Sequence, residues 1–157
     1  MARIVLMLST GDMSRLTKLS GNIDVDILTP HIYNAQITEI KRILTKPLYD
    51  RIISDLTNGT LDGEYRLIYD NFIVDMLVYY ASADFVKFAP FQITNGGISR
   101  YLPENATEVD GIEVDKIIKR FEHLAVSVES MFYDYMKDIS IPEYVIDCSK
   151  TNSFKFP

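Results

Sequence analysis

Side chains that commonly bind metal ions are few in this sequence and widely separated. His31 and His123 fall on different predicted helices, and neither has a second histidine or a cysteine at ligand spacing. Residues 58–63 match the start of a calcium-binding loop, but the twelfth position is Tyr69, where a bidentate glutamate is required. We therefore expect no bound metal, and we interpret both histidines as polar residues on helix faces.

Motifs for nucleophilic catalysis or phosphate binding are also missing. The single cysteine, Cys148, has no histidine near it in sequence, and the chain contains no Gly-x-Ser-x-Gly turn. Gly96-Gly97 lacks the further glycine and the lysine of a phosphate-binding loop. Glu113 and Asp115 flank the start of a predicted helix, where carboxylates favour the positive end of the helix dipole. The sequence therefore predicts no catalytic residue, no cofactor and no enzymatic activity.

Composition points to one globular domain. The chain has 157 residues, 47% of them hydrophobic, and one cysteine, so a single apolar core is expected to hold it without disulfides. A net charge of −6 argues against a protein that neutralises DNA phosphates, so any contact with passing DNA is expected to be non-specific. The apolar run from Ile4 to Leu8 is shorter than a secretory segment, and no run approaches the ~20 residues of a membrane span. We expect a soluble protein with no membrane partner.

The elements that would position any functional residue are mostly helices. Apolar residues recur every three or four positions in four windows, which predicts helices over 26–44, 47–58, 64–88 and 112–137. Thr45-Lys46-Pro47 separates the first two, because a proline fits the opening turn of a helix better than its interior. The broad apolar stripe of 64–88 predicts a central helix buried on more than one side, and 112–137 has the longest stripe. The start of the chain predicts a short extended segment to Leu8, followed by a short helix carrying Met13, Leu16 and Leu19.

Two segments outside these helices are candidates for contacts with other molecules. Asn95-Gly96-Gly97 lies between two short polar segments and predicts a hairpin that projects from the helices. Residues 143–157 form a tail without helical period, which we expect to be extended and held by a surface outside the fold. Ten tyrosines and eight phenylalanines with no tryptophan favour an assembly surface over a catalytic pocket. The candidate interface residues are Asn95, Gly96, Gly97, Tyr101, Tyr144, Phe154 and Phe156.

The predicted fold is therefore mainly α. We expect a single-domain helical bundle over residues 1–142 with a long C-terminal helix, a projecting glycine-rich loop and an extended tail over 143–157. The bundle needs neither metal nor disulfide, because its helices supply enough apolar area for one core.

The order of these elements resembles the head-tail connector, or adaptor, proteins of tailed bacteriophages, closest to those of Bacteroides-type and crAss-like phages. The similarity covers about residues 4–135 and rests on structural motifs. In Leu44-Thr45-Lys46-Pro47-Leu48-Tyr49 the family usually has Leu-Gly-x-x-Leu-Tyr, and we interpret Lys46-Pro47 as standing in place of the family's glycine. The other matching segments are Gly21-Asn22-Ile23-Asp24, Leu28-Thr29-Pro30-His31-Ile32, Ala35-Gln36, Asn58-Gly59-Thr60-Leu61 and the run from Phe88 to Ile98.

This resemblance implies a structural virion protein. Such a protein forms a ring, with twelve copies expected, beneath the portal, where it joins the capsid head to the tail and extends the DNA channel. Its partners would be further copies of itself, the portal protein, the next tail or ring protein and the passing DNA. It would lie at the head-tail junction of the virion, and in the host cytoplasm during assembly. An acidic channel lining would repel phosphate and keep the DNA from adhering.

Two other classes of function stay open. One is a small cytoplasmic helical module of phage origin that binds a single protein partner. The other is a small hydrolase whose carboxylates assemble across helices. Particle size separates the first from the connector, because a connector forms a ring, free or on a portal, whereas the module stays a monomer or dimer. Metal-dependent turnover would be required for the hydrolase.

Overall fold

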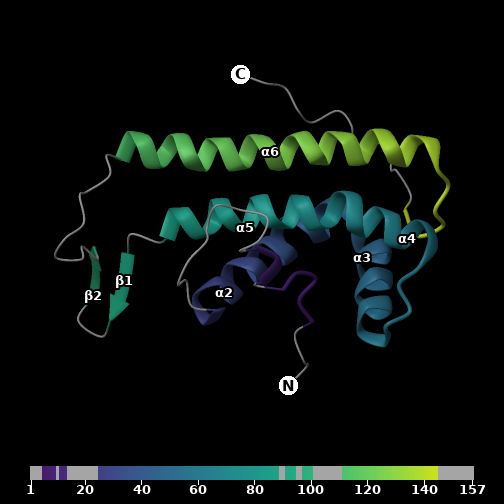
Figure 1. The fold of residues 1–157 in the computed structure, drawn as a ribbon, viewed down its shortest axis with the longest axis horizontal. Coiled ribbons are helices and arrows are strands. Elements are labelled where there is room, and N and C mark those ends of the chain that lie inside the picture. Colours follow the sequence, from purple (N-terminus) through teal and green to yellow (C-terminus); the bar gives the residue numbers. More distant parts are fainter. Residues whose placement is uncertain are drawn as a thin grey trace.

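Two long helices, one above the other, set the shape of the molecule (Figure 1). This computed structural model describes residues 5–9, 11–13, 25–88, 91–94, 97–100 and 111–144. Its elements are α2 (Val25–Ala35), the π-helical segment η1 (Gln36–Ile40), α3 (Lys41–Asn58), α4 (Gly63–Ile68), the π-helical segment η2 (Tyr69–Ile73), α5 (Val74–Phe88), β1 (Phe91–Thr94), β2 (Gly97–Arg100) and α6 (Gly111–Asp138). The predicted mainly α fold is confirmed.

Helix α5 is the central element. Figure 1 shows α6 along one side of it and α2 and α3 on the other. Met76, Leu77 and Ala81 are 0% exposed, because neighbouring helices cover α5 on more than one side. The broad apolar stripe that predicted a central helix is thereby explained, since a helix with two packed sides needs apolar residues around most of its circumference.

A corner at Thr45 separates two helical stretches within α3. Thr45 has φ 63° and ψ 158°, a non-helical conformation, while Leu44 and Leu48 on either side of it are fully buried. Pro47 follows in the first turn of the second stretch, where its missing N–H costs little. This confirms the predicted break at Thr45-Lys46-Pro47. The second stretch ends at Gly59, whose φ of 68° is the left-handed C-cap that glycine adopts most readily.

The π-helical segments η1 and η2 were not predicted. Each lies inside a window that the apolar period marks as one continuous helix, 26–44 for η1 and 64–88 for η2. A π-turn adds a residue to the helical turn without interrupting the helix, so a three-to-four spacing of apolar residues does not reveal it. The two windows are therefore helical from end to end, but their turns are not all of one kind.

Helix α6 has 28 residues and is about 42 Å long at the α-helical rise. Its predicted range, 112–137, agrees with the observed bounds to one residue. Its fully buried residues, Ala125, Phe132 and Met136, all lie in its second half. Two members of the predicted apolar stripe, Ile117 and Met131, are nevertheless 45% and 61% exposed. The stripe is thus wider than the surface that α5 covers.

The two strands form an antiparallel hairpin. Phe91 pairs with Arg100 and Thr94 with Gly97, which leaves a two-residue connection between the strands. Figure 1 shows both strands beyond the end of α5, apart from the helical body. This confirms the hairpin predicted around Asn95-Gly96-Gly97, and the strands project from the helices as expected. None of the helices in the described ranges is both long and apolar enough to cross a membrane.

Candidate functional site

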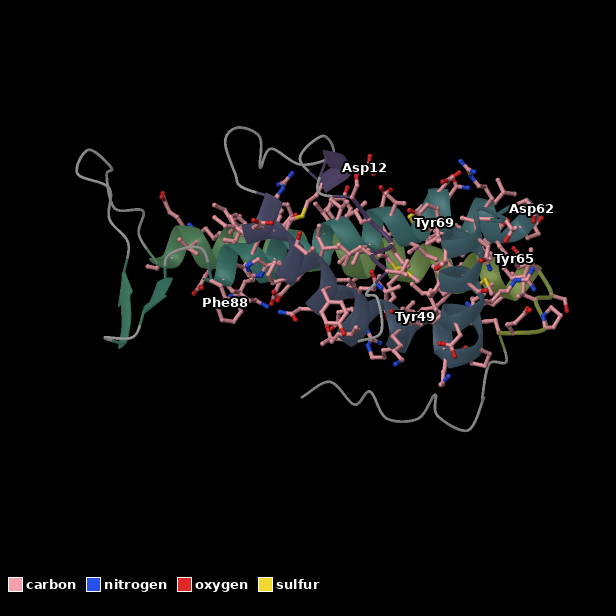
Figure 2. The ribbon with its side chains drawn as sticks, turned by 90° about the horizontal axis from the view of Figure 1, so that it is seen from below. Asp12, Tyr49, Asp62, Tyr65, Tyr69 and Phe88 are labelled. Atoms are coloured by element: carbon pink, nitrogen blue, oxygen red, sulfur yellow. The ribbon has the colours of Figure 1, made fainter. Side chains whose placement is uncertain are left out.

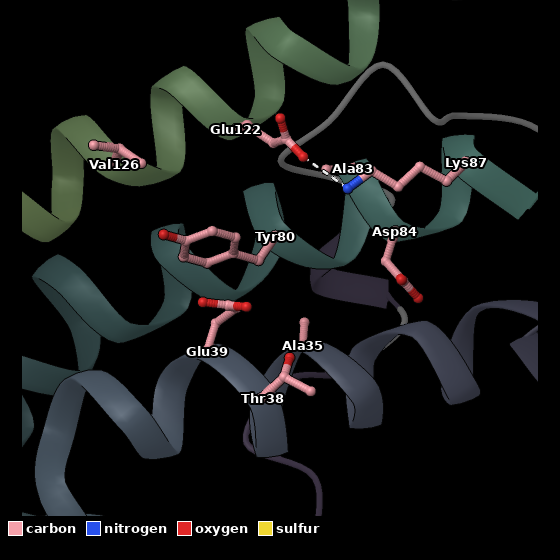
Figure 3. A pocket seen from close by; sticks show the side chains of 9 residues that line it. All are labelled: Ala35, Thr38, Glu39, Tyr80, Ala83, Asp84, Lys87, Glu122 and Val126. Atoms are coloured by element: carbon pink, nitrogen blue, oxygen red, sulfur yellow. Dashed lines mark hydrogen bonds and ion pairs between the residues drawn. The ribbon is translucent and has the colours of Figure 1, made fainter. Parts of the chain in front are cut away.

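One open pocket lies between the end of α2, η1, α5 and α6 (Figure 3). Its volume is about 310 Å³. An ion pair between Lys87 Nζ and Glu122 Oε1, 2.7 Å long, joins α5 to α6 at its edge. The lining residues are Ala35, Thr38, Glu39, Tyr80, Ala83, Asp84, Lys87, Glu122 and Val126. The pocket therefore offers three carboxylates, one ammonium group and one phenol.

The ionisable groups of this pocket are already engaged with one another or with neighbours. Glu39 accepts a hydrogen bond from Arg42 at 3.1 Å, and Tyr80 donates one to Glu129 at 2.8 Å. Asp84 lies 2.7 Å from His31. A general base needs a lone pair directed at a substrate. The carboxylates of Glu39, Asp84 and Glu122 instead contact Arg42, His31 and Lys87 of the same protein. The pocket has the character of a helix junction with a polar rim.

His31 and Asp84 form the closest approach to a catalytic pair. His31 Nδ1 lies 2.7 Å from Asp84 Oδ2, and the two side chains are 14% and 27% exposed. The His31 ring contacts Phe85 edge-on and stacks on Phe88, with centroid distances of 5.5 and 6.0 Å. The pair links α2 to α5, and the His31 ring packs against two aromatic side chains of α5. This agrees with the interpretation of His31 as a polar helix-face residue and adds its partner.

Glu129 is the centre of a polar cluster between three helices. Tyr80 and Tyr133 donate hydrogen bonds to its two oxygens at 2.8 and 2.9 Å, and Arg42 approaches the same oxygens at 3.3 and 3.4 Å. The Glu129 side chain is 13% exposed. Burial raises the pKa of Tyr80 and of Tyr133, and the hydrogen bond to Glu129 raises each further. The cluster joins the start of α3, the middle of α5 and α6.

Gln36 holds the N-terminal segment against the helices. Its side-chain oxygen accepts the backbone N–H of Met7 at 2.8 Å, and its Nε2 donates to the carbonyl of Val5 and to the Tyr49 hydroxyl, both at 2.9 Å. Tyr69 donates to the carbonyl of Met7. Gln36 opens η1 and Tyr69 opens η2, so both π-helical segments supply a side chain to this clamp. The clamp satisfies backbone groups that have no neighbouring strand.

The expected N-terminal elements are described only in part. Residues 5–9 form neither helix nor strand and bend at Met7 and Leu8, so the predicted extended segment is not confirmed, whereas residues 11–13 are helical. Met13 is fully buried and Met7 is 2% exposed, so this segment belongs to the core. Leu16 and Leu19, predicted to continue the short helix, lie outside the described residues.

The start of the C-terminal tail packs against the chain's own helices. Tyr65 donates a 2.6 Å hydrogen bond to Glu143, and this bond lowers the pKa of the Glu143 carboxyl. Arg51 lies 4.8 Å from the centre of the Tyr65 ring and 3.6 Å from Glu143. The Tyr144 ring meets Phe132 edge-on at 5.6 Å. Figure 2 shows Tyr65 near the end of the molecule opposite Phe88.

These contacts concern only the first two residues of the tail. We expected residues 143–157 to be held from outside the fold, whereas Glu143 and Tyr144 are half-buried and contact Tyr65 and Phe132 of their own chain. Tyr144 and the other proposed interface residues stay predictions. Gly97 begins β2, whereas Asn95, Gly96, Tyr101, Phe154 and Phe156 lie outside the described residues.

Comparison with known proteins gives a family without a function. A family model described as a family of unknown function, DUF6712, matches residues 40–153. The chain belongs to this family. No curated protein and no solved structure matches the chain. The matched range runs from the end of η1 through α6, so the family pattern includes the corner at Thr45, the hairpin and the long helix.

The polar clusters at Glu129 and Gln36 are the features that the sequence analysis missed. Glu129 lies four residues after the buried Ala125 and three before the buried Phe132, so its position is on the core side of α6. Gln36 lies next to the buried Ala35 and four residues before Ile40. A polar residue at a core position is the signal for such a cluster, but its partners come from other helices and cannot be read from spacing. Among the described residues no group of three or more His, Cys, Asp or Glu side chains is placed to hold a metal ion.

Proposed function

We propose that this DUF6712 chain is a subunit of a ring at the head-tail junction of a tailed bacteriophage. The ring would dock beneath the portal, join the capsid head to the tail and extend the DNA channel, with twelve copies expected. Its partners would be copies of itself, the portal protein and the next ring or tail protein. The proposal starts from the resemblance in the sequence, and several features of the structure support it.

The observation that carries the proposal is the backbone at Thr45. In the connector pattern Leu-Gly-x-x-Leu-Tyr, the glycine falls on Thr45, and not on Lys46-Pro47, when the leucines and tyrosine are matched to Leu44, Leu48 and Tyr49. Thr45 has φ 63° and ψ 158°, a conformation that glycine adopts easily and a β-branched residue adopts at a cost of about 1–3 kcal/mol. This chain therefore has a backbone suited to glycine at the position where the connector pattern has a glycine. This agreement supports the proposal.

The hairpin supports an assembly role. An isolated two-stranded sheet is at best marginally stable in water, and β1 and β2 lie beyond the helical body in Figure 1. Its two outer strand edges have backbone groups available for pairing with another chain. A hairpin in this position fits a contact with a neighbouring subunit or the portal.

The polar side chains of the helical body support a structural role. Glu129, Gln36 and Asp55 are hydrogen-bonded within the protein, and no buried side-chain nitrogen or oxygen in the described ranges lacks a partner. Buried polar groups that are fully satisfied fix helices in one arrangement. Such a body suits a building block that presents its contacts on projecting segments.

Electron microscopy of the purified chain mixed with the portal protein of the same phage tests the proposal. We expect a ring of twelve copies on one end of the portal. Changing both Gly96 and Gly97 to Val should leave the helical circular dichroism of the free chain unchanged and reduce ring occupancy, because a β-branched residue in place of Gly96 disfavours the positive φ of a two-residue hairpin turn. A chain that stays at one or two copies and leaves the portal bare contradicts the proposal and favours the alternative, a small cytoplasmic protein-binding module of phage origin.

A further inference from the structure

Helix α6 carries a second apolar row beside the one that packs on α5. We call this row the α6 flank, and it follows steps of four and three residues along nearly the whole helix. At 100° per residue its centre lies about 70° around the helix from the buried row of Ala125 and Phe132. The members of the α6 flank are Ile117, Phe121, Leu124, Val128, Met131 and Tyr135.

The α6 flank is only partly covered by its own chain. Ile117 is 45% exposed and Met131 is 61% exposed, while Phe121, Leu124 and Val128 are half-buried. Tyr135, at the end of the flank, is also half-buried: its ring lies 5.1 Å from that of Phe72, and its hydroxyl donates to Glu64 of α4 at 2.8 Å. Apolar residues at alternating four- and three-residue steps are typical of helices that pack side by side, with the side chains of one helix inserted between those of the other. Within the described ranges, no helix of the same chain covers Ile117 or Met131 on the outer side of that pattern.

We propose that the α6 flank binds the α6 flank of a second copy of this chain, with the two helices antiparallel. A two-fold axis near Leu124 to Val128 then aligns all six members in each helix. Ile117 of one copy meets Tyr135 of the other, Phe121 meets Met131, and Leu124 meets Val128. Every member therefore contacts an apolar residue, and none is left beyond the end of the other helix.

Charges beside the α6 flank select the antiparallel arrangement. The exposed residues Arg120, Ser127 and Asp134 border the flank on its solvent side at seven-residue spacing. In the two-fold register Arg120 of each copy lies beside Asp134 of the other, and the two Ser127 residues meet at the axis. Two attractive pairs thus form at once, and the antiparallel helix dipoles are also favourable. Asp134 pairs with Lys137 in its own chain at 2.7 Å, but both side chains are at least 65% exposed, so this pair is weak.

This pairing does not rest on the proposed ring. A two-fold contact uses the same surface on both copies and closes after two chains, whereas a ring repeats a contact between two different surfaces. The α6 flank and the hairpin are separate surfaces, so the dimer is a property of the free chain. The ring is tested in the presence of the portal, and either result there leaves the dimer test unaffected.

Sedimentation of the full-length chain over a range of concentrations is the first test. We expect reversible dimers, and Met131→Lys should weaken them at least tenfold, because it places a charge inside the contact. Ile112→Lys is the matched control, since Ile112 is 63% exposed on the same helix but outside the α6 flank. Circular dichroism should show that both variants keep their helices. A chain that is monomeric at all attainable concentrations overturns the proposal, as does an equal effect of the two variants.

Charge reversal tests the register. Arg120→Glu alone should weaken the dimer, and Arg120→Glu combined with Asp134→Arg should restore it, because the pairs between the copies are re-formed with opposite signs. In a Cys148→Ser background, Ser127→Cys should be cross-linked to dimers by a short bis-maleimide, while Lys119→Cys, on the far side of the helix, should not. Failure of the double reversal to restore the dimer, or cross-linking of Lys119→Cys in preference, rules out the antiparallel contact.

Discussion

Replacing Glu129 by alanine should lower the free energy of unfolding by about 3–5 kcal/mol, because Glu129 binds groups from three helices. Tyr80 and Tyr133 each donate to its carboxylate at less than 3 Å, and a hydrogen bond to a charged group contributes about 1.5–3 kcal/mol. Arg42 adds little, since its side chain is 52% exposed and water replaces the lost contact. Alanine leaves two half-buried phenols without an acceptor.

Urea denaturation at neutral pH measures this loss. Glu122→Ala is the matched control, because Glu122 also joins α6 to α5, but its ion pair with Lys87 is exposed, so the variant should lose no more than about 1 kcal/mol. Glu129→Gln should fall between the two alanine variants, since its amide keeps one acceptor oxygen but loses the charge. The Tyr80→Phe and Tyr133→Phe variants should each destabilise the native protein and have almost no effect in the Glu129→Ala background.

The outcome that refutes this reasoning is a Glu129→Ala variant as stable as Glu122→Ala. It would mean that water or a shifted side chain satisfies both phenols at no cost, and that the cluster does not hold α5 and α6 together. If a variant changes the slope of the free energy of unfolding against urea concentration, its unfolded or native state has changed. The contribution of Glu129 would then be judged from the double-mutant cycle alone.

Three further predictions follow from the corner, the tyrosines and the tail. Thr45→Gly should raise the melting temperature, since it relieves about 1–3 kcal/mol of backbone strain and loses only a 3.4 Å hydrogen bond to Glu143; an unchanged or lower value would show that the corner is unstrained. The pKa values of Tyr80 and Tyr133 are raised above the ordinary value of 10 in the folded state, so the stability that this shift contributes is complete below pH 10 and falls as the pH rises above 10. The Tyr80→Phe/Tyr133→Phe double variant should therefore lose less free energy of unfolding between pH 9 and 11 than the native chain. Deleting residues 150–157 should leave the melting temperature unchanged and reduce incorporation into the ring, and a large loss of stability would place the tail in the core.

The helices could be predicted because the sequence marks them locally. The four predicted windows coincide with the observed helices to within a few residues, since each has an apolar period and a recognisable end. Pro47 and Gly59 mark two of those ends by their own backbone preferences. The hairpin could be predicted for the same reason, because Asn95-Gly96 suits a two-residue turn whatever surrounds it.

The polar clusters could not be predicted, because their partners lie far apart in sequence. Glu129 and Arg42 are separated by 87 residues, and Tyr65 and Glu143 by 78. Spacing within one helix gives the side on which a residue lies but not the helix that it meets. The contact of the Tyr144 ring with Phe132 was not predicted either, because it forms only where the chain turns back after the end of α6.

The corner at Thr45 explains how one short helix comes to hold both ends of the described chain. The buried Leu44 and Leu48 fix the backbone on either side of the corner, so the strained conformation persists because the core determines it. The corner sets the direction in which the second stretch of α3 leaves η1. One turn of that stretch then places Tyr49 against Gln36, which holds the N-terminal segment, and Arg51 beside Tyr65 and Glu143, which hold the start of the tail. The strained backbone at Thr45 is tolerated because the contacts of Tyr49 and Arg51 depend on the direction that the second stretch of α3 takes after the corner.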